Sequence, residues 1–182
     1  MVPEARIEPS EAGLVAATAG WFAVNIRDAA WMTSESFGDA CIIEGDAAPF
    51  AQIGYTLAVL RPGQPSGLYH REANQEDFLV IAGECVLLVE GEERRLRAWD
   101  FVHCPPGTEH IFVGAGDGPC LIFMAGARTE PRDTVYPRSD VARRHGAGAE
   151  TETAVSKEAY APFSRWRPGP PTSWDGLPWA LR

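Results

Sequence analysis

Short runs of apolar residues, separated by turn residues, dominate the middle of the chain. The runs comprise residues 55–60, 77–81, 85–89, 94–98, 101–104, 110–113 and 120–124. They are rich in Val, Ile, Leu and Phe, which is typical of strands, and glycine or proline punctuates the gaps between them. No stretch of this zone keeps the 3.6-residue apolar period of a helix over three turns. The pattern therefore predicts an all-β sandwich or barrel.

Several of these runs are apolar at consecutive positions, as in Phe78-Leu79-Val80-Ile81. Alternate residues of a strand face opposite sides of a sheet, so such strands need cover on both faces. One face would line the barrel interior, and the other would meet a second sheet, an arm or a subunit.

The chain divides into three zones, of which residues 51–127 form the barrel core. Residues 1–50 are weakly patterned and are expected to form an N-terminal segment whose strands join the barrel. Within that segment, residues 21–26 and 41–43 predict strands, and residues 28–31 predict a turn.

The third zone, residues 128–182, predicts one short helix followed by an extended arm. Ser139 suits an N-cap, Asp140 the first turn and Gly146 the C-terminal end of this helix. The remainder is rich in Pro and Trp. Because an exposed tail gains nothing from tryptophan, we expect an arm that lies on the barrel or on a neighbouring subunit. A disordered tail and a docking segment for another protein are the alternatives.

Charge and composition exclude several classes of binding partner. The 182 residues carry a formal net charge of -9 without a basic cluster, which argues against nucleic acid and anionic membranes. The longest nearly uncharged stretch, residues 12–26, is shorter than the roughly 20 residues of a membrane span. Acidic residues precede it, where a secretion signal would be basic. The four cysteines form no CxxC pair, so we expect reduced, buried thiols in a cytoplasmic protein.

One segment carries most of the candidate chemistry. His70 and Glu72 are two residues apart and share a face of a strand, and Glu76 keeps that parity. His110 offers a second imidazole at the start of a later strand. Two carboxylates inside an apolar barrel cannot both stay ionised without a cation. Together these four side chains predict a site for one divalent transition metal, with Mn, Fe or Zn as the candidates.

At these positions the sequence resembles the cupin superfamily. The first cupin motif is matched by His70, Glu76 and Gly83, and Pro62-Gly63 precedes it as usual. The second motif is matched by the residues Asp100, Pro105, Gly107 and His110. The resemblance covers about residues 55–127. It implies a cupin-type double-stranded β-helix, a jelly-roll barrel that is usually dimeric and often holds one metal through three His and one Glu.

The chain departs from these motifs at three positions. Trp99 replaces the glycine before Asp100, and Gly114 replaces the terminal Asn. Glu72 stands where the second His is expected, so it enters the shell of ligands that the resemblance implies. A carboxylate there makes the site harder, although the same replacement also fits a site that has lost its metal. If Glu72 is not a ligand, it becomes the candidate general base. Tyr69 is a further candidate for contact with substrate.

Two hypotheses follow for function. In the first, the chain is a metal-dependent enzyme that acts on a small oxygenated compound, of the dioxygenase, isomerase, epimerase or decarboxylase type that the resemblance implies. In the second, it is a non-catalytic cupin that senses or binds a small molecule. The aromatic tail and the strands that are apolar on both faces also predict a homodimer.

Overall fold

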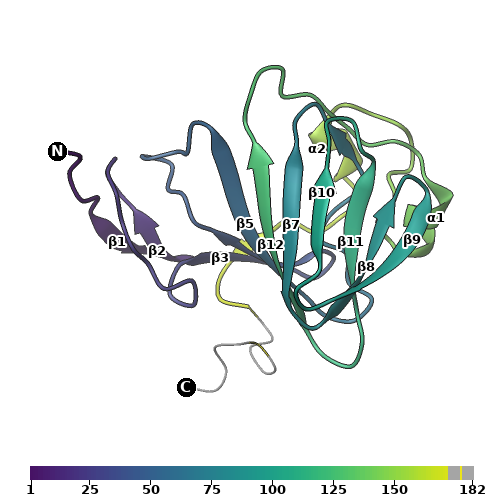
Figure 1. Cartoon of the computed structure of the whole chain (residues 1–182), viewed down its shortest axis with the longest axis horizontal. Coiled ribbons are helices and arrows are strands. Elements are labelled where there is room, and N and C mark those ends of the chain that lie inside the picture. Colours follow the sequence, from purple (N-terminus) through teal and green to yellow (C-terminus); the bar gives the residue numbers. More distant parts are fainter. Residues whose placement is uncertain (172–176, 178–182) are drawn as a thin grey trace.

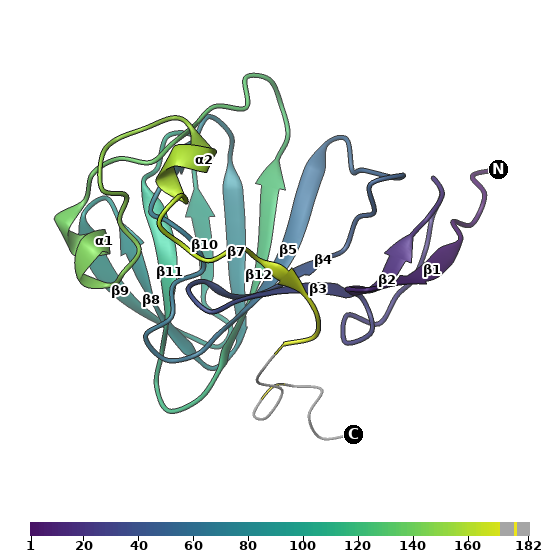
Figure 2. The same cartoon turned by 180° about the vertical axis from the view of Figure 1, so that it is seen from behind.

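A β-barrel forms the main body of the molecule, with residues 7–16 at one side of it and residues 140–168 running along it (Figures 1 and 2). The computed structural model describes residues 1–171 and Leu177. The strands are β1 (Ile7–Ser10), β2 (Gly13–Ala16), β3 (Ala30–Ser34), β4 (Gly38–Ile42), β5 (Ile53–Leu60), β6 (Arg71–Glu72), β7 (Glu76–Ala82), β8 (Glu84–Val89), β9 (Glu92–Arg97), β10 (Phe101–Cys104), β11 (His110–Ala115), β12 (Cys120–Ala127), β13 (Thr134–Val135) and β14 (Arg167–Pro168). The helices are α1 (Asp140–Arg144) and α2 (Ser156–Ala159).

Two antiparallel sheets make up the barrel. The larger sheet has the strand order β10-β7-β12-β5-β4-β3-β14, and the smaller has the order β11-β8-β9. The core between them takes Phe78 and Val80 from β7, Leu60 from β5, and Leu87 and Phe112 from the smaller sheet. Because this core draws on both sheets, they must face one another. The all-β jelly-roll barrel that the sequence predicts is therefore confirmed.

The outer face of the larger sheet is also covered in part. Trp31, Cys41 and Leu57 lie on this face of the sheet, and Val24 and Ile26, which precede β3, pack against them. The expectation that the strands with consecutive apolar residues have cover on both faces is confirmed for this part of the sheet. The cover comes from the chain's own N-terminal segment.

Two local predictions for the N-terminal segment are wrong. Residues 21–26 do not form a strand, because the Asn25 side chain accepts from Arg27 N–H at 3.0 Å and its carbonyl from Asp28 N–H at 2.9 Å, which turns the chain. The turn expected at residues 28–31 lies earlier, at residues 26–28, and the chain enters β3 at Ala30, where Trp31 pairs with Cys41. The short strand expected at residues 41–43 corresponds to the end of β4.

The helix predicted from its caps is present as α1. The Ser139 hydroxyl accepts a hydrogen bond from the Ala142 N–H at 3.3 Å, and Asp140 lies in the first turn. Gly146 follows the helix with a φ of 69°, a left-handed conformation that glycine adopts without a steric cost.

The arm lies on its own barrel as far as the structure describes it. Phe37 contacts Tyr160 and Phe163, with ring centroids 5.2 and 4.7 Å apart, and the Tyr160 hydroxyl accepts from Leu68 N–H at 3.1 Å. β14 then pairs with β3. The second helix, α2, is too short for the sequence pattern to predict. The expected arm residues Trp174 and Trp179 lie outside the described residues. Among the described helices, none has the length and hydropathy needed to cross a membrane.

Candidate metal centre

His70 and His110 come together although they are distant in sequence. The two residues form an isolated antiparallel bridge, in which each backbone N–H donates to the other's carbonyl, at 3.2 and 2.8 Å. This pairing sets their side chains on the same face, with ring centroids 5.0 Å apart. The two imidazoles that the sequence singled out therefore share one site.

Both imidazole rings are oriented by the backbone. The His70 Nδ1 lies 2.8 Å from the Leu68 carbonyl oxygen, and the His110 Nδ1 lies 3.0 Å from that of Thr108. A carbonyl oxygen only accepts hydrogen bonds, so each Nδ1 carries the proton and each Nε2 keeps a free lone pair. This arrangement orients and fixes the tautomer of metal-binding histidines.

Glu76, the first residue of β7, completes the cluster. Its Oε2 lies 3.4 Å from the His110 Nε2, and one ligand atom from each of His70, Glu76 and His110 lies within 4.8 Å of the other two. The side chains are largely buried, with 15% of Glu76 and 2% of His110 exposed. The structure thus brings three of the four predicted ligands together as a group able to hold a metal ion.

Burial shifts the pKa of each group in this cluster toward its neutral form. Loss of water, followed by the charge of Glu72, raises the pKa of Glu76 to about 8. Burial and then the neighbouring His70 lower the pKa of His110 to about 4. Burial also lowers the pKa of His70. The protein alone therefore does not stabilise an ionised Glu76.

These residues fit a divalent cation. Two neutral imidazole nitrogens and one carboxylate are ligands that first-row divalent metals accept. Ligand atoms bound at about 2.1 Å lie about 3–3.5 Å apart, so small side-chain shifts within the present 4.8 Å would close the shell. A cation would also favour the ionised form of the buried Glu76.

Glu72 lies beside the cluster rather than within it. Its Oε1 is 3.8 Å from the His70 Nε2, and the Thr134 hydroxyl donates to the same oxygen at 3.5 Å. The Glu72 side chain is 32% exposed and lines a cavity together with Glu76. Its carboxylate is therefore close enough to the cluster to act on a bound ligand.

Tyr69 is not brought to this cluster. Neighbouring residues of an extended segment face opposite sides, so Tyr69 points away from the face that His70 occupies. It is fully buried in a cluster with Leu88 and Val141, and its hydroxyl accepts from Gly91 N–H at 3.0 Å.

The barrel cavity, of about 370 Å³, adjoins the three-residue cluster. It is lined by Ile42, Glu44, Gly54, Tyr55, Thr56, Glu72, Glu76, Met124, Ala125, Gly126, Ala127 and Arg128. Arg128 donates to both carboxylate oxygens of Glu44 and to the Phe50 carbonyl. Sequence reasoning missed this ion pair because its partners lie 84 positions apart and match no motif.

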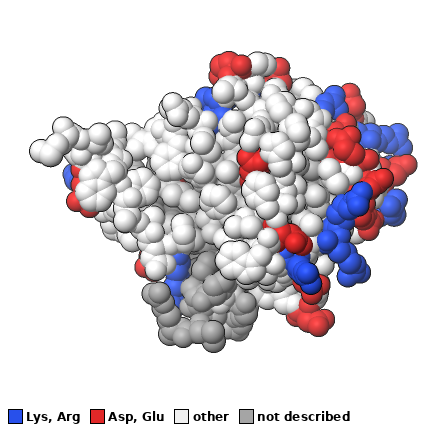
Figure 3. Space-filling model, viewed as in Figure 1, with Lys and Arg blue, Asp and Glu red and all other residues white. Residues whose placement is uncertain are grey.

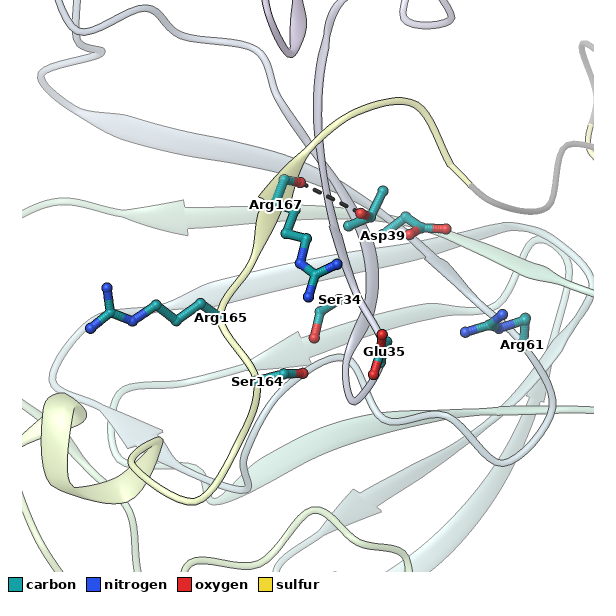
Figure 4. Close-up of a pocket in the computed structure, with 8 residues that line it drawn as sticks. Ser34, Glu35, Asp39, Arg61, Ser164, Arg165 and Arg167 are labelled. Carbon is teal, nitrogen blue, oxygen red and sulfur yellow. Dashed lines mark hydrogen bonds between the residues drawn. The ribbon is translucent and has the colours of Figure 1, made fainter.

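The tail cavity, of about 240 Å³, lies between the β3–β4 turn and the arm (Figure 4). It is lined by Thr33, Ser34, Glu35, Asp39, Arg61, Ser164, Arg165 and Arg167. Arg61 and Arg167 point toward Ser34 and Glu35 from opposite sides, and Arg165 points away. None of these lining residues is a histidine or a cysteine.

Comparison with known proteins agrees with the fold. Residues 56–126 match the cupin domain family. That part of the chain is a cupin domain, as the motifs around His70 and His110 predict. No curated protein sequence matches the chain.

Solved structures resemble this one at low sequence identity. The polyketide cyclase RemF from Streptomyces resistomycificus is 14% identical with a TM-score of 0.52, over 61% of this chain and 82% of that one. A Cupin 2 conserved barrel domain protein from Salinispora arenicola CNS-205 is 22% identical with a TM-score of 0.47, over 54% and 82%. A proposed sugar phosphate isomerase from Acidithiobacillus ferrooxidans ATCC 23270 is 24% identical with a TM-score of 0.42, over 46% of this chain and 54% of that one. This chain therefore spans about half the length of the last protein.

Proposed function

We propose that the chain is a metal-dependent enzyme in which His70, Glu76 and His110 hold one divalent ion, Mn, Fe or Zn. The observation that carries the proposal is the pair of backbone carbonyls that fix each imidazole with its Nε2 lone pair free. Each imidazole is held by one such carbonyl, and their ligand atoms lie within 4.8 Å of each other and of a Glu76 carboxylate oxygen. The substrate is a small oxygenated compound that enters the barrel cavity.

A divalent ion at this position supplies a Lewis acid that polarises an oxygen of the bound compound. Glu72 is the candidate general base, because its carboxylate lies beside the cluster and faces the same cavity. The Thr134 hydroxyl donates to Glu72 and so orients the carboxylate. Proton removal next to an oxygen function is the step that isomerases and epimerases share. A decarboxylase would instead break a C–C bond, release CO2 and protonate the carbon left behind. With Fe, two histidines and one carboxylate are also the ligands of oxygenases.

The test is metal analysis of protein purified without chelator or nickel resin. Wild type is expected to hold about one equivalent of Mn, Fe or Zn, and the His70→Ala/His110→Ala variant less than about a tenth. His103→Ala is the matched control, since His103 is exposed and pairs with Asp77. A double variant that keeps its metal contradicts the proposal. A wild type without metal, whose melting temperature does not rise when metals are added, favours the non-catalytic binding protein instead.

A homodimer is also proposed, on a surface that the described chain leaves open. The described tail aromatics, Tyr160, Phe163 and Trp166, pack on their own barrel, so the support comes from the outer face of β7 and β10. Trp99 is 75% exposed there and Phe101 is 64% exposed. Figure 3, in the orientation of Figure 1, shows few charged side chains over the middle of this face. Exposed apolar surface of this kind is typical of interfaces, and a second copy of the chain is the proposed occupant.

Sedimentation velocity tests the homodimer. The full chain is expected to sediment as a dimer and the Phe101→Glu variant as a monomer, whereas a wild-type monomer contradicts the proposal.

A cytoplasmic location is proposed from the thiols. All four cysteines are buried and free, and burial raises the pKa of Cys41 to about 12 and that of Cys104 to about 11. Such thiols suit a reducing compartment.

A further inference from the structure

The cationic side chain of the barrel cavity is already neutralised. Arg128 is the only Lys or Arg among the described residues that line this cavity. Its Nη1 donates to Glu44 Oε2 at 2.9 Å and to the Phe50 carbonyl at 2.8 Å, and its Nη2 donates to Glu44 Oε1. The hydrogen bonds from Arg128 hold the pKa of Glu44 below its usual value. Glu44 therefore takes the hydrogen bonds from Arg128 that a substrate carboxylate would otherwise accept.

The remaining edge of the Arg128 guanidinium is closed by the backbone. A Cβ placed on Gly54 would lie 2.7 Å from both the Nε and the Nη2 of Arg128. Gly54 thus packs directly against the edge that holds the last N–H groups, and this leaves no room for a ligand oxygen between them. While Glu44 stays ionised, Arg128 therefore offers a second anion no uncompensated positive charge.

The residues that line the cavity carry no excess positive charge that could balance an anionic ligand. Among its lining residues, three carboxylates and one guanidinium leave a net charge of -2, which one divalent cation would cancel. The other lining residues include the apolar Ile42 and Met124, together with Thr56. A carboxylate or phosphate would bring uncompensated charge into this partly apolar space.

The volume limits the size of the ligand. Small-molecule sites in proteins measure about 300–1,000 Å³, and the barrel cavity, at about 370 Å³, is near the lower limit. One or two rings would fill it. Glu72, which lines the cavity, supplies an acceptor for a hydroxyl proton.

We infer that the barrel cavity selects an uncharged, hydroxylated compound of one or two rings and rejects carboxylates and phosphates, because Glu44 already neutralises Arg128. The inference rests on the proposed function, since the balance of charge includes the divalent ion. It makes Glu44 a specificity-determining residue, because removal of its charge leaves the positive charge of Arg128 unbalanced.

Two ligands of nearly the same shape test this selection. 2′-Hydroxyacetophenone and salicylate share a ring, a hydroxyl and a neighbouring carbonyl, but only salicylate carries a carboxylate. Binding is measured by calorimetry on the full chain loaded with its metal, and the metal content of each sample is measured alongside. Wild type is expected to bind the ketone at least about tenfold more tightly than salicylate.

Variants that remove the charge of Glu44 or Arg128 test whether this ion pair causes the preference for the ketone. Glu44→Gln is expected to bind salicylate at least about tenfold more tightly than wild type does, and Glu44→Gln/Arg128→Met is expected to lose that gain. Glu35→Gln, which removes an exposed carboxylate in the tail cavity, is the control and should leave both affinities unchanged.

The outcomes separate the two proposals. Metal-loaded wild type that binds salicylate as tightly as the ketone, or that binds neither ligand, overturns the inference and leaves the metal site intact. A Glu44→Gln variant with unchanged preference also overturns it. Wild type without metal overturns the proposed function, and the inference falls with it.

Discussion

The barrel cavity and the tail cavity are both lined by charged side chains, yet only one is arranged for chemistry. At the barrel cavity, Glu76 lies next to His70 and His110, whose rings are fixed by backbone carbonyls. At the tail cavity, Arg61 and Arg167 are exposed and approach the exposed Glu35. Donors that are buried, fixed and convergent define a candidate metal site, whereas exposed charges from flexible side chains do not.

The difference comes from the backbone. His70 and His110 bridge to each other through two main-chain hydrogen bonds, so their separation is set by the sheet. The tail cavity instead lies between the β3–β4 turn and the arm, which meets β3 through the short strand β14. Variants at the two cavities should therefore differ in what they change and by how much.

The largest expected effect is on metal affinity in Glu76→Gln. The amide cannot carry the charge that balances the cation, so affinity should fall by at least about 100-fold, or about 2.8 kcal/mol. The matched variant at the tail cavity, Glu35→Gln, should stay within about twofold of wild type. Competition against a metal-binding dye measures both. Equal losses of metal affinity in the two variants would contradict the claim that only the barrel cavity adjoins a metal site.

The next effect is on how the arm is attached to the barrel. Tyr160→Phe removes the hydroxyl that accepts from the buried Leu68 N–H, at a cost of about 1–2 kcal/mol in the free energy of unfolding. Tyr55→Phe is the control, since its hydroxyl has no hydrogen bond within the described part of the chain. Urea denaturation measures both variants. A loss in Tyr160→Phe no greater than in Tyr55→Phe would show that this contact does not hold the arm.

A smaller effect, which depends on pH, is expected at the Glu44–Arg128 pair. Because Arg128 lowers the pKa of Glu44 in the folded state, the pair stabilises the fold above the ordinary pKa of 4.5. This stability is lost as the pH falls through the lowered pKa. Wild type should exceed Glu44→Gln by about 1 kcal/mol at pH 7, and the difference should shrink below about pH 4.5. Urea denaturation at several pH values checks it, and a difference that grows on acidification would be the wrong sign.

The smallest effect is expected at the tail cavity itself. Arg167 is exposed, and its guanidinium has no hydrogen bond or ion pair within residues 1–171. Arg167→Gln should therefore change the free energy of unfolding by less than about 0.5 kcal/mol and leave metal content unchanged. Thermal and urea denaturation test the first point. A larger loss would mean that the tail cavity contributes to the fold as the barrel cavity does.

Much of the barrel and its cluster could be predicted from the sequence because their signals are local. The apolar runs predicted the strands and their cover on both faces, and the cupin motifs singled out His70, Glu76 and His110. The parity that links His70 to Glu72 also carried the signal that Tyr69 faces the other way.

The rest depends on contacts between distant segments. Glu44 and Arg128 are joined only when β4 and β12 both flank β5, and no spacing in the sequence reveals this. The turn at Asn25 replaced an expected strand because one side chain bonded to the local backbone. The helix α2 has too few residues to produce a periodic pattern.

Anomalous diffraction at the absorption edge of the bound metal tests the central claim most directly. Crystals of protein purified without chelator should show one strong peak, about 2.0–2.2 Å from the Nε2 atoms of His70 and His110 and from a Glu76 carboxylate oxygen. A structure of metal-replete protein in which these three side chains surround no peak, or in which the ion lies elsewhere, would contradict the account.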